Sequence, residues 1–129
     1  MARKDAREFA MQTLFQIDVQ KDFENPDLEK YIGDKKLGGQ KEYVHNLLTQ
    51  ICANISSIDE MINRCSESWP TARMAKTDLA IARIAVGEIL YAEDVPRPVA
   101  INEAVNLAKI YGTDTSAGFI NAILGKIED

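Results

Sequence analysis

The sequence predicts an all-α protein, a compact bundle of six to seven helices that forms a single domain over residues 1–129. Apolar residues recur at spacings of three and four along most of the chain, which is the period of a helix with one buried face. Runs that alternate between apolar and polar residues, as half-buried strands do, are absent from the sequence. The breaks between periodic segments are short and polar, so no linker is predicted to divide the chain.

Four helices are predicted in the first half of the chain. The first covers about residues 4–21, and a short helix follows at residues 26–32 with its proline in the first turn. The third begins at about Lys41. A capping box, in which Ser57 and Glu60 would exchange hydrogen bonds with the backbone, predicts the start of the fourth. The core-facing stripe of the first helix consists of Ala6, Phe9, Ala10, Thr13, Leu14 and Ile17.

The second half of the chain predicts three further helices. Residues 75–93 are apolar around most of the helix circumference, which indicates a central helix packed on several sides. A proline-rich break follows, and a helix over residues 99–112 ends at Gly112, a residue typical of helix C-termini. Residues 113–116, "TDTS", offer side chains that can cap the start of a last helix.

Charge is distributed unevenly along the chain. The protein has 20 Asp and Glu against 15 Lys and Arg, a net charge of −5, which argues against indiscriminate binding to nucleic acid. Residues 1–7 nevertheless carry Arg3, Lys4 and Arg7 against Asp5 alone. Cations at a helix N-terminus oppose the helix dipole, which weakly suggests a binding role. The alternative, which composition alone favours, is a solvated run of charge that Asp5 and Glu8 compensate. Any contact with nucleic acid is therefore expected to be local or to need a partner.

The sequence contains no recognisable catalytic or metal-binding pattern. The one histidine, His45, has no second ligand at the spacing of a metal site. Cys52 and Cys65 lie 13 residues apart without a CxxC motif, so two free thiols are expected. The sequence therefore predicts neither an enzyme nor a bound metal or cofactor.

The cytosol is the expected location. Residues 1–8 are charged and are not followed by the apolar run of a secretory signal. No stretch approaches the ~18 consecutive apolar residues of a membrane-spanning helix, so no membrane partner is expected.

A second candidate binding segment is "YGTDTSAGF", residues 111–119. Its hydroxyls and the backbone N–H groups of a helix start can receive phosphate oxygens. Phe119 can stack on a base or pack in the core, and the residues alone favour helix capping and core packing for this segment.

Four stretches of the sequence together resemble the NusB family of bacterial transcription antitermination factors. They are "ARKDAREFAMQTLFQ", "RIAVGEILY", "DVPRPVAINEAVNLAKIYG" and "SAGFINAILGKI", and they stand in the family's order. The pattern VPxxVAINEAVxLAKxYG is the most specific of them, whereas residues 22–70 match only in helical pattern.

The resemblance implies an all-helical, non-enzymatic protein. It would bind the single-stranded boxA element of leader RNA, notably of ribosomal RNA, together with the ribosomal protein NusE. The pair would join NusA, NusG and RNA polymerase in an elongation complex that passes terminators. The family includes monomers and dimers, so a homodimer is left open.

The resemblance also implies particular binding residues. Asp78 matches an acidic position on the partner-facing surface. Asp5 stands where the family often has another arginine, so RNA binding without the partner should be weakened. Replacing Lys4 and Arg7 by alanine is expected to lower RNA affinity and leave thermal stability nearly unchanged. The implied RNA-binding residues are Arg3, Lys4, Arg7, Gln12, Phe15, Arg83, Thr115, Ser116 and Phe119.

Two alternatives remain open from the sequence. One is a helical protein-interaction module with weak or lost RNA binding, which Asp5 and the acidic net charge favour slightly. The other is the NusB-like N-terminal domain of a ribosomal RNA cytosine methyltransferase, which the length of 129 residues disfavours.

Overall fold

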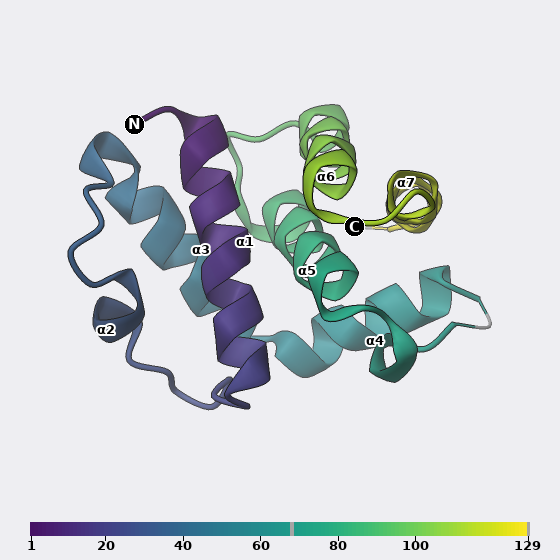
Figure 1. Ribbon diagram of the computed structural model, residues 1–129, viewed down its shortest axis with the longest axis horizontal. Helices are drawn as coiled ribbons and strands as arrows, with labels where there is room; N and C mark the ends of the chain where they lie inside the picture. Colours follow the sequence, from purple (N-terminus) through teal and green to yellow (C-terminus); the bar gives the residue numbers. More distant parts are fainter. Residues whose placement is uncertain (68, 129) are drawn as a thin grey trace.

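A computed structural model describes residues 1–67 and 69–128 (Figure 1). Throughout these residues the regular structure is helical, which confirms the predicted fold class. Two short 3₁₀ helices, Gly38–Gln40 and Thr71–Arg73, precede α3 and α5. Ser68 and Asp129, which the predicted domain 1–129 includes, lie outside the described residues. The α-helices are α1 (Arg3–Val19), α2 (Leu28–Ile32), α3 (Lys41–Ala53), α4 (Ile55–Cys65), α5 (Lys76–Tyr91), α6 (Arg97–Tyr111) and α7 (Ser116–Gly125).

The helix α5 is the centre of the bundle, as its apolar circumference predicts. It contacts α1, α3, α4, α6 and α7, and Figure 1 shows it between α1 and α6 with α4 beside it. Every residue of α5 from Leu79 to Glu88 is buried. Gly87 allows α3 to pack closely, because a Cβ atom there would lie 2.5 Å from Ile51 Cγ1.

Two predicted helix starts are wrong. The helix α4 begins at Ile55, after the single residue Asn54, so Ser57 and Glu60 lie inside the helix and are exposed. The polar run that suggested a capping box is the solvent-facing side of a helix whose other side buries Ile58 and Ile62. At α2 the residue before the helix is Asp27, whose carboxylate accepts the Lys30 N–H at 3.3 Å, and the proline stands outside it.

None of the described helices is long and apolar enough to cross a membrane.

Candidate nucleic-acid interface

One side of α1 carries polar side chains and a half-buried aromatic ring that packs against the edge of the core. Lys4, Glu8 and Gln12 follow one another at a spacing of four, which places them on one helix face, and Phe15 is adjacent. Lys4 and Gln12 are exposed, whereas Glu8 and Phe15 are half-buried. We call these four residues the α1 stripe.

The α1 stripe meets the end of α6 at Tyr111. The Gln12 side-chain amide donates a hydrogen bond to the Tyr111 hydroxyl oxygen at 3.2 Å, across 99 residues of sequence. A hydrogen bond to Glu8, with desolvation as the second cause, raises the pKa of Tyr111. The two candidate segments, 1–15 and 111–119, are therefore neighbours in space, as the family resemblance implies.

Gly112 sets the sharp connection between α6 and α7. Its φ of −93° is open to any residue, so the glycine is not needed for backbone freedom. A Cβ atom there would lie 2.4 Å from Ser116 Oγ and 2.7 Å from the Ala108 carbonyl oxygen. The Ser116 hydroxyl oxygen in turn accepts the Thr113 N–H at 2.9 Å. Thr115, in the same connection, is exposed.

Arg3 faces a different side of α1. Arg3 and Gln12 are nine residues apart, which at about 3.6 residues per turn is two and a half turns. The Arg3 Nε–H donates to Gln40 Oε1 at 2.7 Å, and its guanidinium lies 4.0 Å from the centre of the Tyr43 ring. An ion pair of 3.2 Å joins it to Asp94. Arg3 thus lines a cleft of about 710 Å³ between α3 and the α5–α6 connection, away from the α1 stripe.

Arg7 is not a surface cation. Only 4% of it is exposed, and its Nε–H and Nη2–H donate to the two carboxylate oxygens of the fully buried Glu88 at 2.7 and 2.9 Å. Burial opposes the charge on Arg7, but the hydrogen bonds and charge of Glu88 outweigh it and raise the pKa of Arg7. A direct contact from Arg7 to RNA phosphate does not fit this burial, and the buried pair predicts a loss of stability when Arg7 is replaced by alanine, contrary to the expectation from the sequence.

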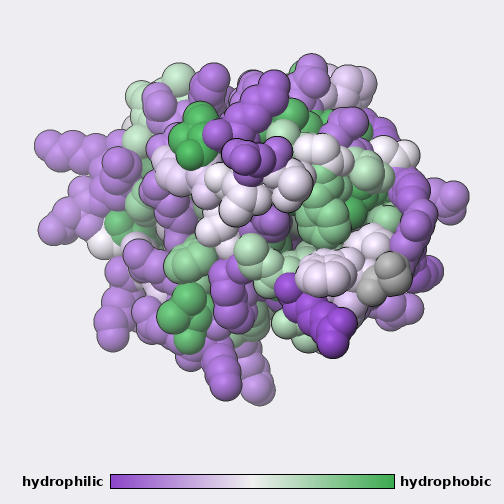
Figure 2. Space-filling view, turned by 45° about the vertical axis from the view of Figure 1, so that its right-hand side comes forward, coloured by the Kyte–Doolittle hydropathy of each residue, from purple (hydrophilic) through white to green (hydrophobic). Residues whose placement is uncertain are grey.

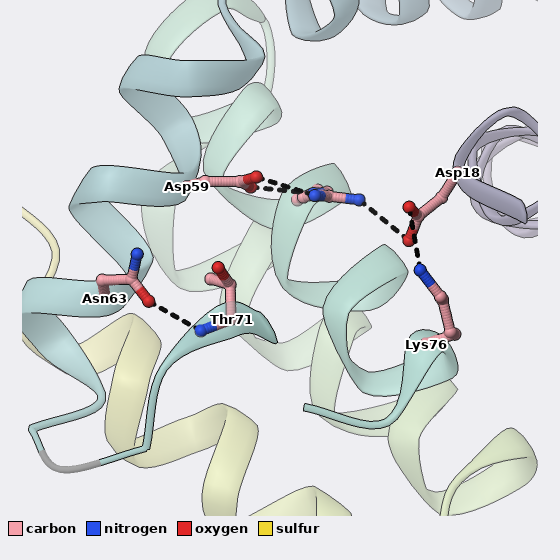
Figure 3. A network of polar contacts seen from close by, with 6 residues as sticks. Asp18, Asp59, Asn63, Thr71 and Lys76 are labelled. Carbon is pink, nitrogen blue, oxygen red and sulfur yellow. Dashed lines mark hydrogen bonds and ion pairs between the residues drawn. The ribbon is translucent and has the colours of Figure 1, made fainter. Parts of the chain in front are cut away.

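The Arg83 guanidinium is likewise bound to carboxylates of the protein itself. Its Nε–H and Nη2–H donate to the two oxygens of Asp59 in α4 at 2.8 and 2.7 Å. Its Nη1 lies 3.2 Å from Asp18 of α1, which also pairs with Lys76 at 3.2 Å. Figure 3 shows Asp59 and Asp18 pointing at one guanidinium from opposite sides. The network joins α1, α4 and α5, so Arg83 is a structural residue rather than a free contact to RNA.

Other predicted residues differ in how much of each side chain is exposed. Ser116 is 1% exposed and its hydroxyl is used within the α6–α7 connection, so it too lacks a surface for RNA. Phe119 is half-buried and packs against the core. Asp78 lies in the first turn of α5, partly exposed, where a negative charge also suits the helix dipole.

Sequence reasoning missed several residues that shape this region. Tyr111 lies in the candidate segment 111–119 but was not named as a binding residue, although it is the last residue of "LAKIY" before a helix-ending glycine. Glu88 and Asp94 gave no signal, since their arginine partners lie more than 80 residues away in the chain. Within residues 1–67 and 69–128, no group of three or more His, Cys, Asp or Glu side chains could hold a metal ion.

The bundle is an all-helical domain in which the polar side chains of the α1 stripe meet Tyr111 at the end of α6. The chain belongs to the NusB family, whose model matches residues 4–129.

Relatives cover nearly the whole chain. A transcription antitermination protein NusB of Alkaliphilus oremlandii is 44% identical over 98% of this chain and 92% of its own length. A protein of the same name from Desulforamulus reducens is 42% identical over 100% of this chain and 91% of its own.

Solved structures share the fold. The T. maritima NusB structure is 34% identical, with a TM-score of 0.87 over 98% of this chain and 89% of that one. A crystal structure of antitermination factors NusB and NusE in complex with dsRNA has a TM-score of 0.80 at 24% identity, over 95% of this chain and 92% of that one. At that identity the likeness concerns the fold alone.

Proposed function

We propose that this protein is a transcription antitermination factor that binds single-stranded boxA-type leader RNA together with the ribosomal protein NusE. Family membership and the names of the relatives support the antitermination role. The observation that carries the RNA-binding part is the contact between Gln12 and Tyr111, which joins the α1 stripe to the exposed hydroxyls of the α6–α7 connection.

The surface suits an unpaired strand. Single-stranded RNA is bound by stacking on aromatic rings and by hydrogen bonds to splayed bases, with cations along the backbone. Lys4 supplies an exposed cation, Gln12 an amide and Thr115 a hydroxyl. Phe15 and Phe119 contribute the exposed edges of half-buried rings. Arg7, Arg83 and Ser116 act in this proposal by holding the helices that carry these groups.

The proposal makes the partner important. Because Arg7 is buried and Arg3 is paired with Asp94, Lys4 is the exposed cation of the α1 stripe. One phosphate contact gives a slope of about −0.7 in log K against log salt, which is much shallower than the slope of about −2 expected for three contacts. Such weak electrostatic attraction, on a protein of net charge −5, leaves much of the affinity to a second protein that extends the surface.

The complex we propose lies in the cytoplasm and includes further components. Asp78 is the candidate contact to NusE, and NusA, NusG and RNA polymerase complete the elongation complex on ribosomal RNA operons. A homodimer that covers the α1 stripe would compete with RNA. Light scattering with and without RNA tests for that competition.

Fluorescence anisotropy with a labelled boxA RNA oligonucleotide tests the function. The protein, NusE and both together are titrated at low salt. The proposal predicts a ternary complex that is tighter than either binary one. A double-stranded RNA of the same sequence serves as the control and should bind more weakly.

A helical protein-interaction module is the second candidate, favoured by the pairing of Arg3 and Arg7 with carboxylates. In that case NusE binds the protein, and adding RNA leaves the affinity between them unchanged.

A further inference from the structure

A polar cleft lies along α3, on the opposite side of α1 from α6 and α7 (Figure 1). It is the cleft of about 710 Å³ between α3 and the α5–α6 connection. Glu42, Asn46, Thr49 and Gln50 line it from α3, at spacings that place them on one helix face, and all four are exposed. The cleft therefore has a wall of polar side chains that solvent can reach.

One half of this cleft already binds a guanidinium, that of Arg3. Its Nε–H donates to Gln40 Oε1 at 2.7 Å, and its Nη2 lies 3.2 Å from Asp94 Oδ2. The same guanidinium lies 4.0 Å from the centre of the Tyr43 ring. A ring face, an amide oxygen and a carboxylate are groups that an arginine side chain prefers, because its planar cation stacks on rings and donates in fixed directions. Arg3 therefore shows which chemistry the walls of the cleft recognise.

The same kinds of group recur in the rest of the cleft. Tyr91 supplies a second ring, and Gln50 supplies a second amide. Glu42 and Glu93 supply carboxylates, and both residues are exposed. Within residues 1–67 and 69–128, neither carboxylate forms an ion pair with a lysine or an arginine. This half of the cleft can therefore accept cations from a ligand.

The charge of the cleft favours a cationic ligand. Its lining carries three carboxylates, those of Glu42, Glu93 and Asp94, against the single cation of Arg3. Such an excess of negative charge repels phosphate, so nucleic acid is disfavoured. Apolar side chains are few in the lining, and the α6–α7 side, turned forward in Figure 2, also has only small apolar areas separated by hydrophilic side chains. A positively charged segment therefore fits the cleft better than an apolar helix does.

The cleft continues along α3 into a second hollow of about 470 Å³. The two share Gly39, Glu42 and Asn46, so they form one continuous depression, which we call the α3 trough. The helix α3 has 13 residues and is about 20 Å long, at about 1.5 Å per residue. An extended peptide rises about 3.3 Å per residue, so roughly six residues match that length. The α3 trough therefore has room for a short peptide segment.

We propose that the α3 trough binds an arginine-rich segment of another protein. Guanidinium groups of the segment pair with Glu42 and Glu93. One of them stacks on the Tyr91 ring, as the Arg3 guanidinium stacks on Tyr43. Arginine is preferred to lysine, because its planar fork donates to carboxylates in pairs and stacks on rings. The inference does not depend on the proposed RNA-binding function, since the trough lies away from the α1 stripe.

Fluorescence anisotropy with a labelled peptide of six arginines tests the proposal on the full chain at low salt. A peptide of six lysines, which has the same charge, is the matched control ligand. The proteins compared are the wild type, the double variant Glu42→Gln/Glu93→Gln and the control double variant Glu60→Gln/Glu102→Gln. Both variants lose two exposed carboxylates, but only the first loses them from the α3 trough. Circular dichroism checks that each variant is folded.

The proposal predicts saturable binding of the arginine peptide and weaker binding of the lysine peptide. Glu42→Gln/Glu93→Gln lowers the affinity for the arginine peptide by roughly 3- to 30-fold, as expected for the loss of two exposed ion pairs. The control double variant binds like the wild type. In ¹⁵N–¹H correlation spectra the arginine peptide shifts the backbone amide signals of Asn46 and Gln50 and leaves those of the α1 stripe in place.

Any of four results would overturn the inference. An equal loss in the two double variants would mean that the net charge of the protein, and not the α3 trough, attracts the peptide. Equal affinities for the two peptides would remove the preference for guanidinium groups. A single-stranded RNA oligonucleotide that shifts the Asn46 and Gln50 signals would assign the trough to nucleic acid. A wild type that does not bind the arginine peptide saturably would show that the trough holds no such segment.

Discussion

Arg7 of α1 and Glu88 of α5 form a buried ion pair with two parallel hydrogen bonds of 2.7 and 2.9 Å. The two residues are 81 positions apart, and Glu88 has no solvent-exposed surface. The pair fastens the first turns of α1 to the central helix, and it withdraws one of the three N-terminal cations from the surface.

Replacing Arg7 by alanine should destabilise the protein severely. The change leaves the Glu88 carboxylate buried without its partner, which in other proteins costs about 3–5 kcal/mol. Urea unfolding followed by circular dichroism measures the loss. Lys4→Ala, which removes an exposed cation from the same turn, is the control and should change stability little. A combined Arg7→Met and Glu88→Leu variant should recover much of the loss; an Arg7→Ala loss as small as that of Lys4→Ala would refute the structural role.

Gly87→Ala should destabilise the contact between α3 and α5. The added Cβ atom would lie 2.5 and 2.6 Å from two carbon atoms of Ile51, a side chain that is fully buried. Overpacking of this kind costs about 1–3 kcal/mol. Gly118→Ala in α7 is the matched control, since nothing lies within 4 Å of its added Cβ atom. Equal stability of the two variants in urea unfolding would show that α3 can shift to accept the methyl group.

Lys21→Gly should stabilise the protein. Lys21 has a φ of +55° at the end of α1, where the Asp22 N–H donates to the Ile17 carbonyl and the Lys21 N–H donates to Asp18. This hydrogen-bond pattern normally takes glycine at that position. Relief of the left-handed backbone strain is expected to raise the free energy of unfolding by about 0.5–1.5 kcal/mol. The greater freedom of glycine in the unfolded chain offsets part of this gain. Gln20→Gly, at a φ of −84°, should give no gain in the same thermal or urea unfolding experiment.

The two thiols should react at different rates. Burial, and then the charge of Asp22, raise the pKa of Cys52 to about 11, whereas Cys65 is half-buried. Because the thiolate is the reactive form, Ellman's reagent at pH 8 should modify Cys65 first and Cys52 only on unfolding. Cys65→Ser should remove the fast phase and Cys52→Ser should keep it. The opposite assignment would contradict the burial of Cys52.

The raised pKa of Cys52 also predicts that the contribution of this thiol to stability falls as the pH rises. The thiol stays protonated in the folded protein above its ordinary value of 9.0, so its burial favours folding below pH 9. That contribution is lost as the pH rises from 9 through about 11. A Cys52→Ala variant should therefore show a smaller fall in stability over this range.

The helical fold was predictable because it depends on local periodicity. The apolar circumference of α5 indicated its central place, and the stripe of α1 indicated which face it buries. The start of α4 was mispredicted because polar residues on an exposed helix face read like a turn when packing is not known. The helix is held to the core by Ile58 and Ile62, and their burial is visible only in the folded structure.

The candidate site was predictable only in part, because charge in a sequence does not say where a side chain points. Lys4 and Gln12 are exposed on the α1 stripe, as a binding role requires. In the sequence, Arg7 resembles Lys4, which is a surface cation. In the structure it pairs with Glu88, and no local pattern in the sequence indicates this partner. Arg3 is similar, since Asp94 and Tyr43 come from other parts of the chain.

The salt dependence of RNA binding by Lys4→Ala tests the central claim most directly. Log K for a boxA RNA oligonucleotide is measured against log salt, with NusE present, for the wild type, Lys4→Ala and Lys30→Ala. Lys30 is exposed on α2, on the other side of α1 from α6 (Figure 1), so both variants lose one positive charge but only one loses it from the α1 stripe. The account predicts that Lys4→Ala binds more weakly and that its slope is shallower by about 0.7, while Lys30→Ala keeps the wild-type slope. Identical slopes for the two variants would contradict an RNA interface on the α1 stripe.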